Sequence, residues 1–236
     1  MADKSQQDQG GKDGEGASVT PTPNPVSGAP GAPASTAPAF AHRDPSRAEF
    51  WNERFEKAFM PWDAAGVPSA LREFVASETA PQATLIPGCG AAHEAAWLDG
   101  QGWPVRAIDF SPVAVEQAKA LLGPRAELVE EADFFAYTPP FTIDVIYERA
   151  FLCALPRTLW QGYARRVAQL LPSGARLAGF FFLRETPKGP PFGIAPDALN
   201  ALLAQDFVCE VDRQVDAADS VPVFAGAEHW MVWRRR

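Results

Sequence analysis

The sequence predicts an α/β protein whose core is a mostly parallel, doubly wound sheet of seven strands that ends in an antiparallel hairpin. Two observations carry this prediction. Short apolar segments alternate with helical patterns from residue 83 to residue 204, and this alternation is typical of βαβ units. The last two apolar segments, 207–215 and 228–233, have no long helix between them, so we expect them to pair as a hairpin.

Each expected element follows from apolar spacing and from the residues that bound it. Strands are expected at 83–87, 105–108, 126–129, 143–147, 176–183, 207–215 and 228–233. Helices are expected at 92–98, 112–122, 159–171 and 196–204, with another starting near Pro68. Ser111 is a suitable N-cap, with Pro112 at the first helical position. A further helix is expected after Ser46, which forms a capping-box pattern with Glu49.

The first 41 residues differ in composition from the rest of the chain. Residues 1–40 hold six prolines and six glycines but few large apolar side chains. Such a segment buries too little apolar surface to offset the entropy of ordering it. We therefore expect residues 1–41 to be a disordered tail and residues 42–236 to form one folded domain.

Composition narrows the class of protein. The chain has 29 acidic and 21 basic residues, a formal net charge of −8, which argues against nucleic acid as its main partner. No apolar run reaches the roughly 18 residues of a membrane span, and the N-terminus lacks the apolar core of a secretory signal. Three cysteines favour a reducing compartment, and the three histidines show no metal-ligand spacing. We expect a cytoplasmic, monomeric protein with no metal and no membrane partner.

A glycine loop follows the first expected strand of the sheet. Gly88-Cys89-Gly90 comes between that strand and a helix, an arrangement that lets backbone N–H groups approach a ligand. Asp109 ends the second strand, 21 residues after Gly88, where a carboxylate can accept hydrogen bonds from both hydroxyls of a ribose. This Rossmann-like pattern suits a dinucleotide or S-adenosylmethionine.

The helix after this loop carries an acidic residue in its first turn. Glu94 would repel the pyrophosphate of a dinucleotide but would attract an amino group or a sulfonium. The third glycine of a dinucleotide loop is also missing. The loop therefore favours a cationic ligand.

An acidic residue and an aromatic residue follow the third expected strand. Asp133 can accept from an adenine amino group, and Phe134 can cover the face of the ring. A turn residue and a core residue would have the same sequence pattern, so both interpretations remain open.

These motifs, in this order, resemble a class I S-adenosylmethionine-dependent methyltransferase and, more closely, the thiopurine S-methyltransferase family, which includes thiol and halide methyltransferases. The resemblance covers about residues 48–234. It rests on Phe50-Trp51-x-x-Arg54-Phe55 with Pro61-Trp62-Asp63, Pro87-Gly88-Cys89-Gly90-x-Ala92-x-Glu94, Asp109-x-Ser111-Pro112, Asp133-Phe134-Phe135, the run from Tyr147 to Pro156, and Gly189-Pro190-Pro191-Phe192.

The resemblance implies a role for each matched residue. The aromatic side chains of Trp51, Phe55 and Trp62 would lie over the cofactor, although plant relatives usually have a third tryptophan where this chain has Phe55. The full set of implied cofactor contacts is Trp51, Phe55, Trp62, Gly88, Cys89, Gly90, Glu94, Asp109, Phe110, Asp133, Phe134, Glu148 and Arg149. Arg149 is also implied at the acceptor, where it would position an anion without any dedicated base. Pro190, Pro191 and Phe192 would form a stiff loop there.

We therefore expect an enzyme that moves the methyl group of S-adenosyl-L-methionine to a small soft nucleophile: a thiol, thiopurine, hydrosulfide, thiocyanate or halide. Two alternatives share the glycine loop and Asp109. One is an NAD(P)-dependent reductase, which Glu94 and the missing glycine disfavour. The other is a cofactor-binding module without catalysis, which would bind the cofactor but turn over no acceptor.

Overall fold

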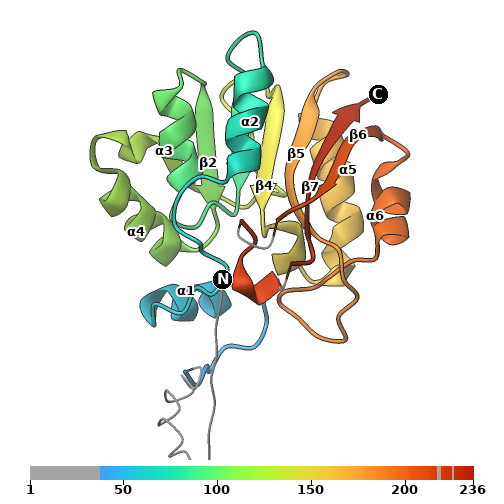
Figure 1. Ribbon diagram of the computed structural model, residues 1–236. Helices are drawn as coiled ribbons and strands as arrows, with labels where there is room; N and C mark the ends of the chain where they lie inside the picture. Colours follow the sequence, from blue (N-terminus) through green and yellow to red (C-terminus); the bar gives the residue numbers. More distant parts are fainter. Residues whose placement is uncertain (1–37, 217–218, 225) are drawn as a thin grey trace, which may run out of the picture. The chain divides into compact units, whose positions relative to one another are not determined.

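The computed structural model describes residues 38–216, 219–224 and 226–236. Within them a seven-stranded sheet has the strand order β3-β2-β1-β4-β5-β7-β6 (Figure 1). Strands β1 to β5 run parallel, whereas β7 is antiparallel to both β5 and β6. The α/β class, the mostly parallel sheet and the terminal hairpin are therefore confirmed.

The strands are β1 (Thr84–Pro87), β2 (Val105–Asp109), β3 (Val129–Glu131), β4 (Val145–Arg149), β5 (Arg176–Phe182), β6 (Phe207–Gln214) and β7 (Glu228–Arg235). The α-helices are α1 (Ala48–Glu56), α2 (Ser69–Ser77), α3 (His93–Gly100), α4 (Pro112–Leu122), α5 (Trp160–Leu170) and α6 (Pro196–Leu203). Short 3₁₀ helices are η1 (Gly123–Leu128), η2 (Leu152–Ala154), η3 (Arg157–Leu159) and η4 (Pro222–Phe224).

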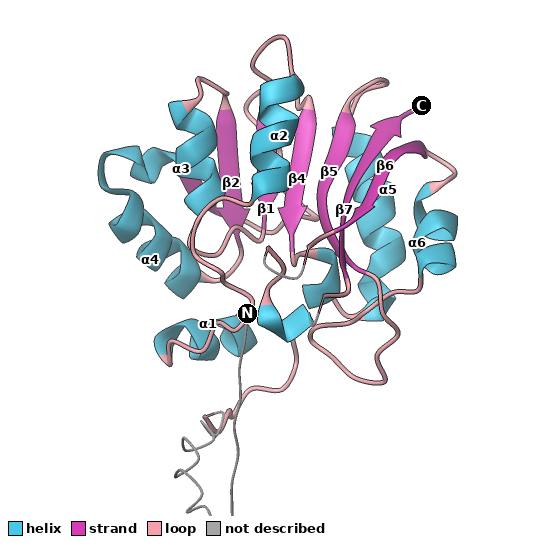
Figure 2. Cartoon of the chain, in the orientation of Figure 1, coloured by secondary structure: helices cyan, strands magenta, loops and turns pink. Residues whose placement is uncertain are grey.

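Helices cover both faces of the sheet (Figure 2). Successive side chains of a strand point to opposite faces, so the buried strands supply two cores. Ile86 and Tyr147 belong to the core under α2, α3 and α4. Their neighbours Leu85 and Ile146 belong to the core under α5 and α6. The continuous apolar runs in the sequence thus reflect strands that are buried on both sides.

Several expected element boundaries were wrong; the strand expected at 143–147, for example, is β4 at Val145–Arg149. Ser46 does not cap α1, because its amide and hydroxyl both donate to Asp44 Oδ1, at 2.9 and 2.7 Å; Arg47 takes the N-cap position without a side-chain bond. The strand expected at 126–129 starts only at Val129, since the chain turns through η1 after Gly123 and Pro124. The expected cap at Ser111 is confirmed, because its hydroxyl accepts from the Ala114 amide at 3.1 Å.

The predicted tail, residues 1–41, lies outside the described residues as far as residue 37. Its last residues differ from the expectation, because they contact α1. Glu53 of α1 accepts hydrogen bonds from the Ala41 amide, and Lys57 donates to the Ala39 carbonyl at 2.6 Å. The segment before α1 is thereby fixed at its carboxyl end.

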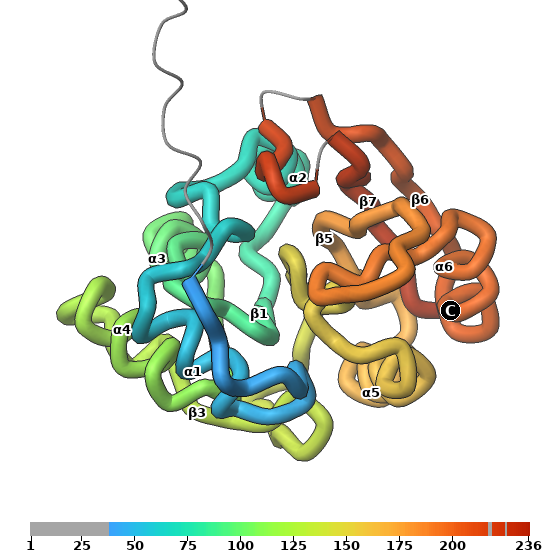
Figure 3. The backbone as a smooth tube through the Cα atoms, turned by 90° about the horizontal axis from the view of Figure 1, so that it is seen from below, coloured from blue at the N-terminus to red at the C-terminus, as the bar shows by residue number. Residues whose placement is uncertain are grey.

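The carboxyl ends of the parallel strands meet at one edge of the sheet, the lower edge in Figure 1, and α1 lies beyond them. The view of this edge in Figure 3 shows α1 and the chain around it in front of the strand ends. In open α/β sheets ligands bind at this edge. No helix within the described ranges is long and apolar enough to cross a membrane.

Strands β4 and β5 approach so closely at Gly179 that no side chain fits there. A Cβ atom on Gly179 would lie 2.0 Å from the Glu148 carbonyl oxygen. We predict that Gly179→Ala lowers the free energy of unfolding by about 1–3 kcal/mol, since overpacking forces the strands apart. Gly100→Ala is the control, because its Cβ would meet nothing within 4 Å at the end of α3. It should be neutral or stabilising by about 0.5–1 kcal/mol. Equal denaturation midpoints for the two variants would contradict this packing.

Candidate functional site

Two adjoining cavities lie at the carboxyl edge of the sheet. The larger has a volume of about 720 Å³, within the range of small-molecule sites, and the smaller about 60 Å³. Five residues line both: Phe55, Trp62, Gly88, Gly90 and Arg149. The glycine loop, two aromatic rings and one guanidinium therefore form the boundary between the two spaces.

The loop between β1 and α3 has the left-handed backbone that the sequence requires of its glycines. Gly88 and Gly90 have φ angles of 59° and 50°, and Ala92 shares this conformation at 56°. A Cβ atom on Gly88 would lie 2.4 Å from the ring of Phe151. The loop is therefore shaped by backbone freedom at Gly88 and by the aromatic side chain opposite it.

Asp109 lines the larger cavity and links the loop after β1 to the loop after β2 through hydrogen bonds. Its carboxylate accepts from the Gly90 amide at 3.1 Å and from the Ser111 amide at 3.0 Å. Burial raises the pKa of Asp109 to about 6, against the opposing effect of these amides. A buried carboxylate of this kind is well suited to bind hydroxyl donors.

Glu94 and Arg149 meet at the smaller cavity, from α3 and β4 respectively. Their closest atoms, Glu94 Oε1 and Arg149 Nη1, are 3.7 Å apart, and each side chain is 13% exposed. The Tyr147 hydroxyl donates to Glu94 at 3.3 Å. Burial raises the pKa of Glu94, and the positive charge of Arg149 opposes that rise. The guanidinium also stacks over Phe180, and Arg149 Nε is buried without a hydrogen bond.

The sequence implied that Glu148 contacts the cofactor, but its side chain lines neither cavity. It is fully buried, and its Oε2 accepts from the amides of Phe151 and Leu152, at 2.9 and 3.2 Å. Neighbouring strand residues face opposite sides, so Arg149 and Glu148 cannot both face the cavity. Burial raises the pKa of Glu148 to about 7. The nearby Tyr163 hydroxyl is buried too, but the two groups form no hydrogen bond of good geometry. Glu148 thus supports the cavity-lining loop from behind.

Aromatic side chains from the N-terminal segment cover the larger cavity. The rings of Trp51 and Trp62 meet edge-on with centroids 5.5 Å apart, and Phe55 contacts Trp62 at 6.2 Å. The Trp51 indole donates to the Pro45 carbonyl at 2.8 Å. The three rings therefore pack on one another while each also lines the cavity.

The residues after β2 and β3 lie at the opposite wall of the larger cavity, which Phe110, Asp133 and Phe134 all line. Asp133 is exposed, and its Oδ1 accepts from the Phe135 amide at 2.9 Å, so it is a turn residue as well as a lining residue. Phe134 is buried, with its ring 5.2 Å from that of Phe151. Asp133 is thus both a turn residue and a cavity residue, and Phe134 both a core residue and a cavity residue.

The expected acceptor loop lines the cavity only in part, because Phe192 is half-buried outside it. Pro190 and Pro191 line the larger cavity, whereas Phe192 packs beneath Arg157 at 5.4 Å, and its amide donates to the Cys153 carbonyl at 2.6 Å.

Cys89 lines only the smaller cavity, and burial raises the pKa of its thiol. No cluster of side chains suited to a metal ion occurs in the described part of the chain.

Several lining residues were not expected from the sequence. Arg43 and Arg54 bring two further positive charges to the larger cavity, and Val223 and Phe224 of η4 contribute apolar surface. Arg54 could have been found, because it lies on α1 within one turn of Trp51 and Phe55. No local pattern marks η4, which reaches the cavity only through the fold.

Comparison with known proteins identifies the family. A model of the thiopurine S-methyltransferase family matches residues 46–236. The chain belongs to this family. It is 29% identical over 199 residues to a thiopurine S-methyltransferase of Xanthobacter autotrophicus, covering 75% of this chain and 91% of the relative. It is 30% identical over 192 residues to one of Vibrio cholerae serotype O1, covering 72% and 84%. The chain is thus an S-adenosylmethionine-dependent methyltransferase, and the reductase alternative is wrong.

Solved structures of methyltransferases share the fold. One is the 1,6-didemethyltoxoflavin-N1-methyltransferase of Burkholderia thailandensis with bound S-adenosylhomocysteine, at a TM-score of 0.61 and 18% identity, over 80% of this chain and 86% of that one. Another is the magnesium protoporphyrin IX methyltransferase of Synechocystis with bound S-adenosylmethionine, at a TM-score of 0.60 and 12% identity, over 84% and 100%.

The residues at the two cavities fit S-adenosyl-L-methionine. Glu94 and Asp109 are buried carboxylates with raised pKa values, so an amino group and ribose hydroxyls would give them hydrogen-bonded partners. The glycine loop between them leaves room for a ligand to approach the backbone, since a Cβ on Gly90 would have no neighbour closer than 3.8 Å.

The burial of Glu148 makes native stability depend on pH. An unfolded glutamate loses its proton near pH 4.5, whereas native Glu148 keeps it up to about pH 7. The unfolded state therefore binds fewer protons in this range, and Glu148 destabilises the native state increasingly as pH rises from 4.5 to 7, by up to about 3 kcal/mol. We predict that the stability of Glu148→Gln relative to wild type rises with pH over this range.

Chemical denaturation at pH 5, 6 and 7 measures this difference. Glu49→Gln is the matched control, since it removes an exposed carboxylate from the first turn of α1. A stability difference between Glu148→Gln and wild type that stays constant from pH 5 to pH 7 would show that the carboxylate is not held as described.

Proposed function

We propose that this enzyme transfers a methyl group to the sulfur of a small thiol or to a related soft nucleophile, namely a thiopurine, hydrosulfide, thiocyanate or halide. The observation that carries the proposal is Arg149, a guanidinium 13% exposed that lines both cavities. A positive charge between the cofactor space and the acceptor space attracts an anionic nucleophile and lowers the pKa of a thiol.

The larger cavity offers no free base, which suits a nucleophile that is already anionic. Its described lining contains no histidine or lysine, and Asp109 and Asp133 already accept from backbone amides. His93 lines only the smaller cavity, 3.8 Å from Asp63. Thiols have pKa values near 8.5, so a modest shift produces the thiolate, whereas alcohols need a base.

The same geometry supports a placement for the cofactor. We assign Glu94 and the Gly88–Gly90 loop to its methionine part in the smaller cavity, and Asp109 to its ribose in the larger one. Phe110, Asp133 and Phe134 then surround the adenine, while Trp51, Phe55 and Trp62 cover the sulfonium. When bound, S-adenosylmethionine supplies an activated methyl group for in-line displacement.

The protein's own contribution is alignment and the exclusion of water. Pro190 and Pro191 face the cavity from the far side, and Phe224 and Phe151 add apolar surface. Such a lining holds a small acceptor in line with the donor and keeps water from competing. Glu148 acts at one remove, by holding the amides of Phe151 and Leu152.

The other assignments follow from this proposal. The partner is a small-molecule methyl acceptor, and the net charge of −8 supports no role for nucleic acid or a membrane surface. We propose that residues 42–236 act as a monomeric, cytoplasmic catalytic domain, to which residues 38–41 add contacts with α1, and that the residues before them are dispensable for turnover.

An acceptor panel tests the proposal. We predict methylation of thiophenol, 6-mercaptopurine or hydrosulfide, measured as S-adenosylhomocysteine release and as methylated product by mass spectrometry. Phenol and aniline are the matched controls, because they replace the sulfur of thiophenol by oxygen or nitrogen. The thiol should react at least about tenfold faster, equivalent to about 1.4 kcal/mol. Faster methylation of phenol or aniline would refute sulfur as the target, and cofactor binding without turnover of any acceptor would support a non-catalytic module.

Substitution of Arg149 tests the role of its charge. Arg149→Ala should lower kcat/KM for thiophenol by about 100-fold, and Arg149→Lys should lower it less. The acid limb of the pH–rate profile should also shift to higher pH in Arg149→Ala, because the bound thiol loses a neighbouring cation. Arg125→Ala, which removes an exposed ion pair with Asp99, is the control. An unchanged pH profile in Arg149→Ala would remove Arg149 from the reaction.

A further inference from the structure

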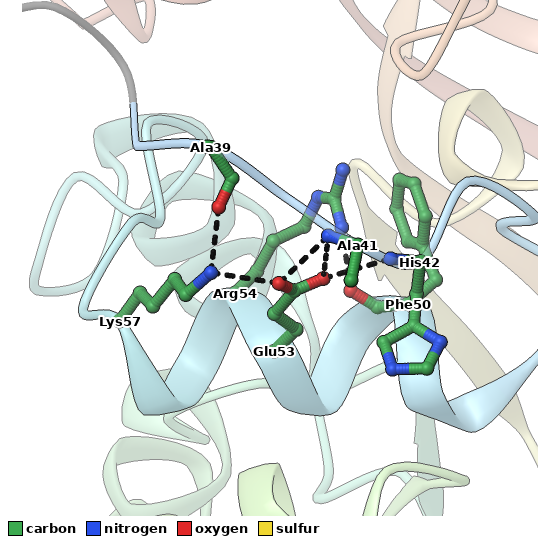
Figure 4. A network of polar contacts seen from close by, with 7 residues as sticks. All are labelled: Ala39, Ala41, His42, Phe50, Glu53, Arg54 and Lys57. Carbon is green, nitrogen blue, oxygen red and sulfur yellow. Dashed lines mark hydrogen bonds and ion pairs between the residues drawn. The ribbon is translucent and has the colours of Figure 1, made fainter.

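The segment before α1 is bound across this helix by a network of polar contacts. We define residues 38–46 as the N-terminal strap. Glu53 accepts from the amides of Ala41 and His42 at 2.9–3.0 Å, and Lys57 donates to Glu53 at 2.7 Å and to the Ala39 carbonyl (Figure 4). These donors lower the pKa of Glu53 to about 2. The strap is therefore held by a carboxylate that stays ionised.

The strap encloses a second guanidinium at the larger cavity. The Arg54 side chain packs against the rings of Phe40 and Phe50, with its central carbon 4.2 and 3.2 Å from their centroids. Figure 4 shows this guanidinium on the strap side of α1. Its Nη1 donates a hydrogen bond to the Phe50 carbonyl at 2.6 Å, which leaves further donors of the guanidinium for another acceptor.

A third arginine extends from the strap itself. Arg43 lines the larger cavity and forms no hydrogen bond or ion pair with any residue that the structure describes. Burial is the largest cause of the lowered Arg54 pKa; the negative charge of Glu53 opposes that lowering, and the nearby charge of Arg43 adds to it. Two like charges thus converge on one part of the cavity, at a cost in free energy that an anion would offset.

The acidic groups near these arginines are already engaged. Glu53 is bound by two amides and by Lys57, and Asp44 is bound by the amide and hydroxyl of Ser46. Asp109 and Asp133 accept from amides at the ends of β2 and β3. Glu53 is near enough to attract Arg54, but its oxygens accept from other donors, and within the described residues no carboxylate forms an ion pair or hydrogen bond with Arg43 or Arg54.

We propose that Arg43 and Arg54 form an anion subsite that binds a carboxylate on the acceptor, so that the favoured acceptor is an aromatic thiol carrying a carboxylate. This inference rests on the proposed function. Guanidinium groups bind carboxylates with two parallel hydrogen bonds, and the rings of Phe50 and Phe59 in the same lining suit a flat apolar body. Arg149 remains at the sulfur, while Arg43 and Arg54 take the distal charge.

The cofactor carboxylate is the competing occupant. It is disfavoured because Arg43 and Arg54 line only the larger cavity, whereas the proposed methionine space is the smaller one, beside Glu94. Titration of S-adenosylhomocysteine into the variants distinguishes an acceptor carboxylate from the cofactor carboxylate as the occupant of the subsite. Its dissociation constant should be the same for wild type, Arg43→Gln and Arg54→Gln, and a clear weakening in both variants would overturn the proposal.

Paired acceptors provide the kinetic test. We expect Arg43→Gln and Arg54→Gln each to raise KM for 4-mercaptobenzoate by at least about tenfold and to leave KM for the neutral 4-methylbenzenethiol nearly unchanged. Arg47→Gln is the matched control, because Arg47 is exposed, pairs with Glu49 and lies outside the cavity lining. Equal effects on both thiols would overturn the subsite. Arg43 is exposed, so its variant stays informative even if Arg54→Gln fails to fold.

A binding measurement separates this inference from the proposed function. Calorimetry of 4-(methylthio)benzoate with the S-adenosylhomocysteine complex requires no turnover. One outcome is that the wild-type protein binds this ligand but methylates neither thiol, and that Arg43→Gln does not bind the ligand. This result would support the subsite and refute thiol methylation. Turnover of both thiols with equal KM, and ligand binding that does not depend on Arg43, would support thiol methylation and refute the subsite.

Discussion

The burial of ionisable side chains at the carboxyl ends of β1, β2 and β4 is the constraint on which the site depends. Glu94, Asp109, Glu148 and Arg149 lie where apolar strands end, and each carboxylate has hydrogen-bond donors that keep it in place. Burial of charge opposes folding unless it is compensated. For Asp109 and Glu148 the compensation comes from backbone amides of the loops themselves, and for Glu94 it comes from the Tyr147 hydroxyl and the Arg149 guanidinium, so the groups that are costly to bury also fix the shape of the cavity.

Charge is distributed unevenly around that cavity. The carboxylates of Glu94 and Asp109 flank the glycine loop, where we propose that the cationic cofactor binds, whereas Arg43 and Arg54 line the larger cavity and Arg149 lies at the boundary of the two. This local excess of positive charge occurs in a chain whose overall net charge is −8. A site with acids on one side and guanidinium groups on the other suits a cationic methyl donor and an anionic acceptor. Soft nucleophiles that ionise near neutral pH are anionic acceptors of this kind.

The fold was predictable because its signals are local. Apolar runs, the Ser111-Pro112 helix start and the Gly88–Gly90 turn each identify one element, and the alternation of elements determines the parallel sheet. The site was predictable only in part. Glu148 and Arg149 are neighbours in sequence, and strand register alone decides which of them faces the cavity. The strap was missed for another reason: its composition resembles the preceding tail, and Glu53, which binds it, lies 11 to 12 residues away.

We propose that one continuous site, divided at Arg149, holds donor and acceptor on opposite sides of the boundary. The most direct measurement is a crystal structure of the chain with S-adenosylhomocysteine and 4-(methylthio)benzoate. The homocysteine part should lie beside Glu94, the ribose should contact Asp109, and the two sulfur atoms should face each other next to Arg149. A nucleoside bound outside the larger cavity, or a thioether remote from Arg149, would contradict the proposed site.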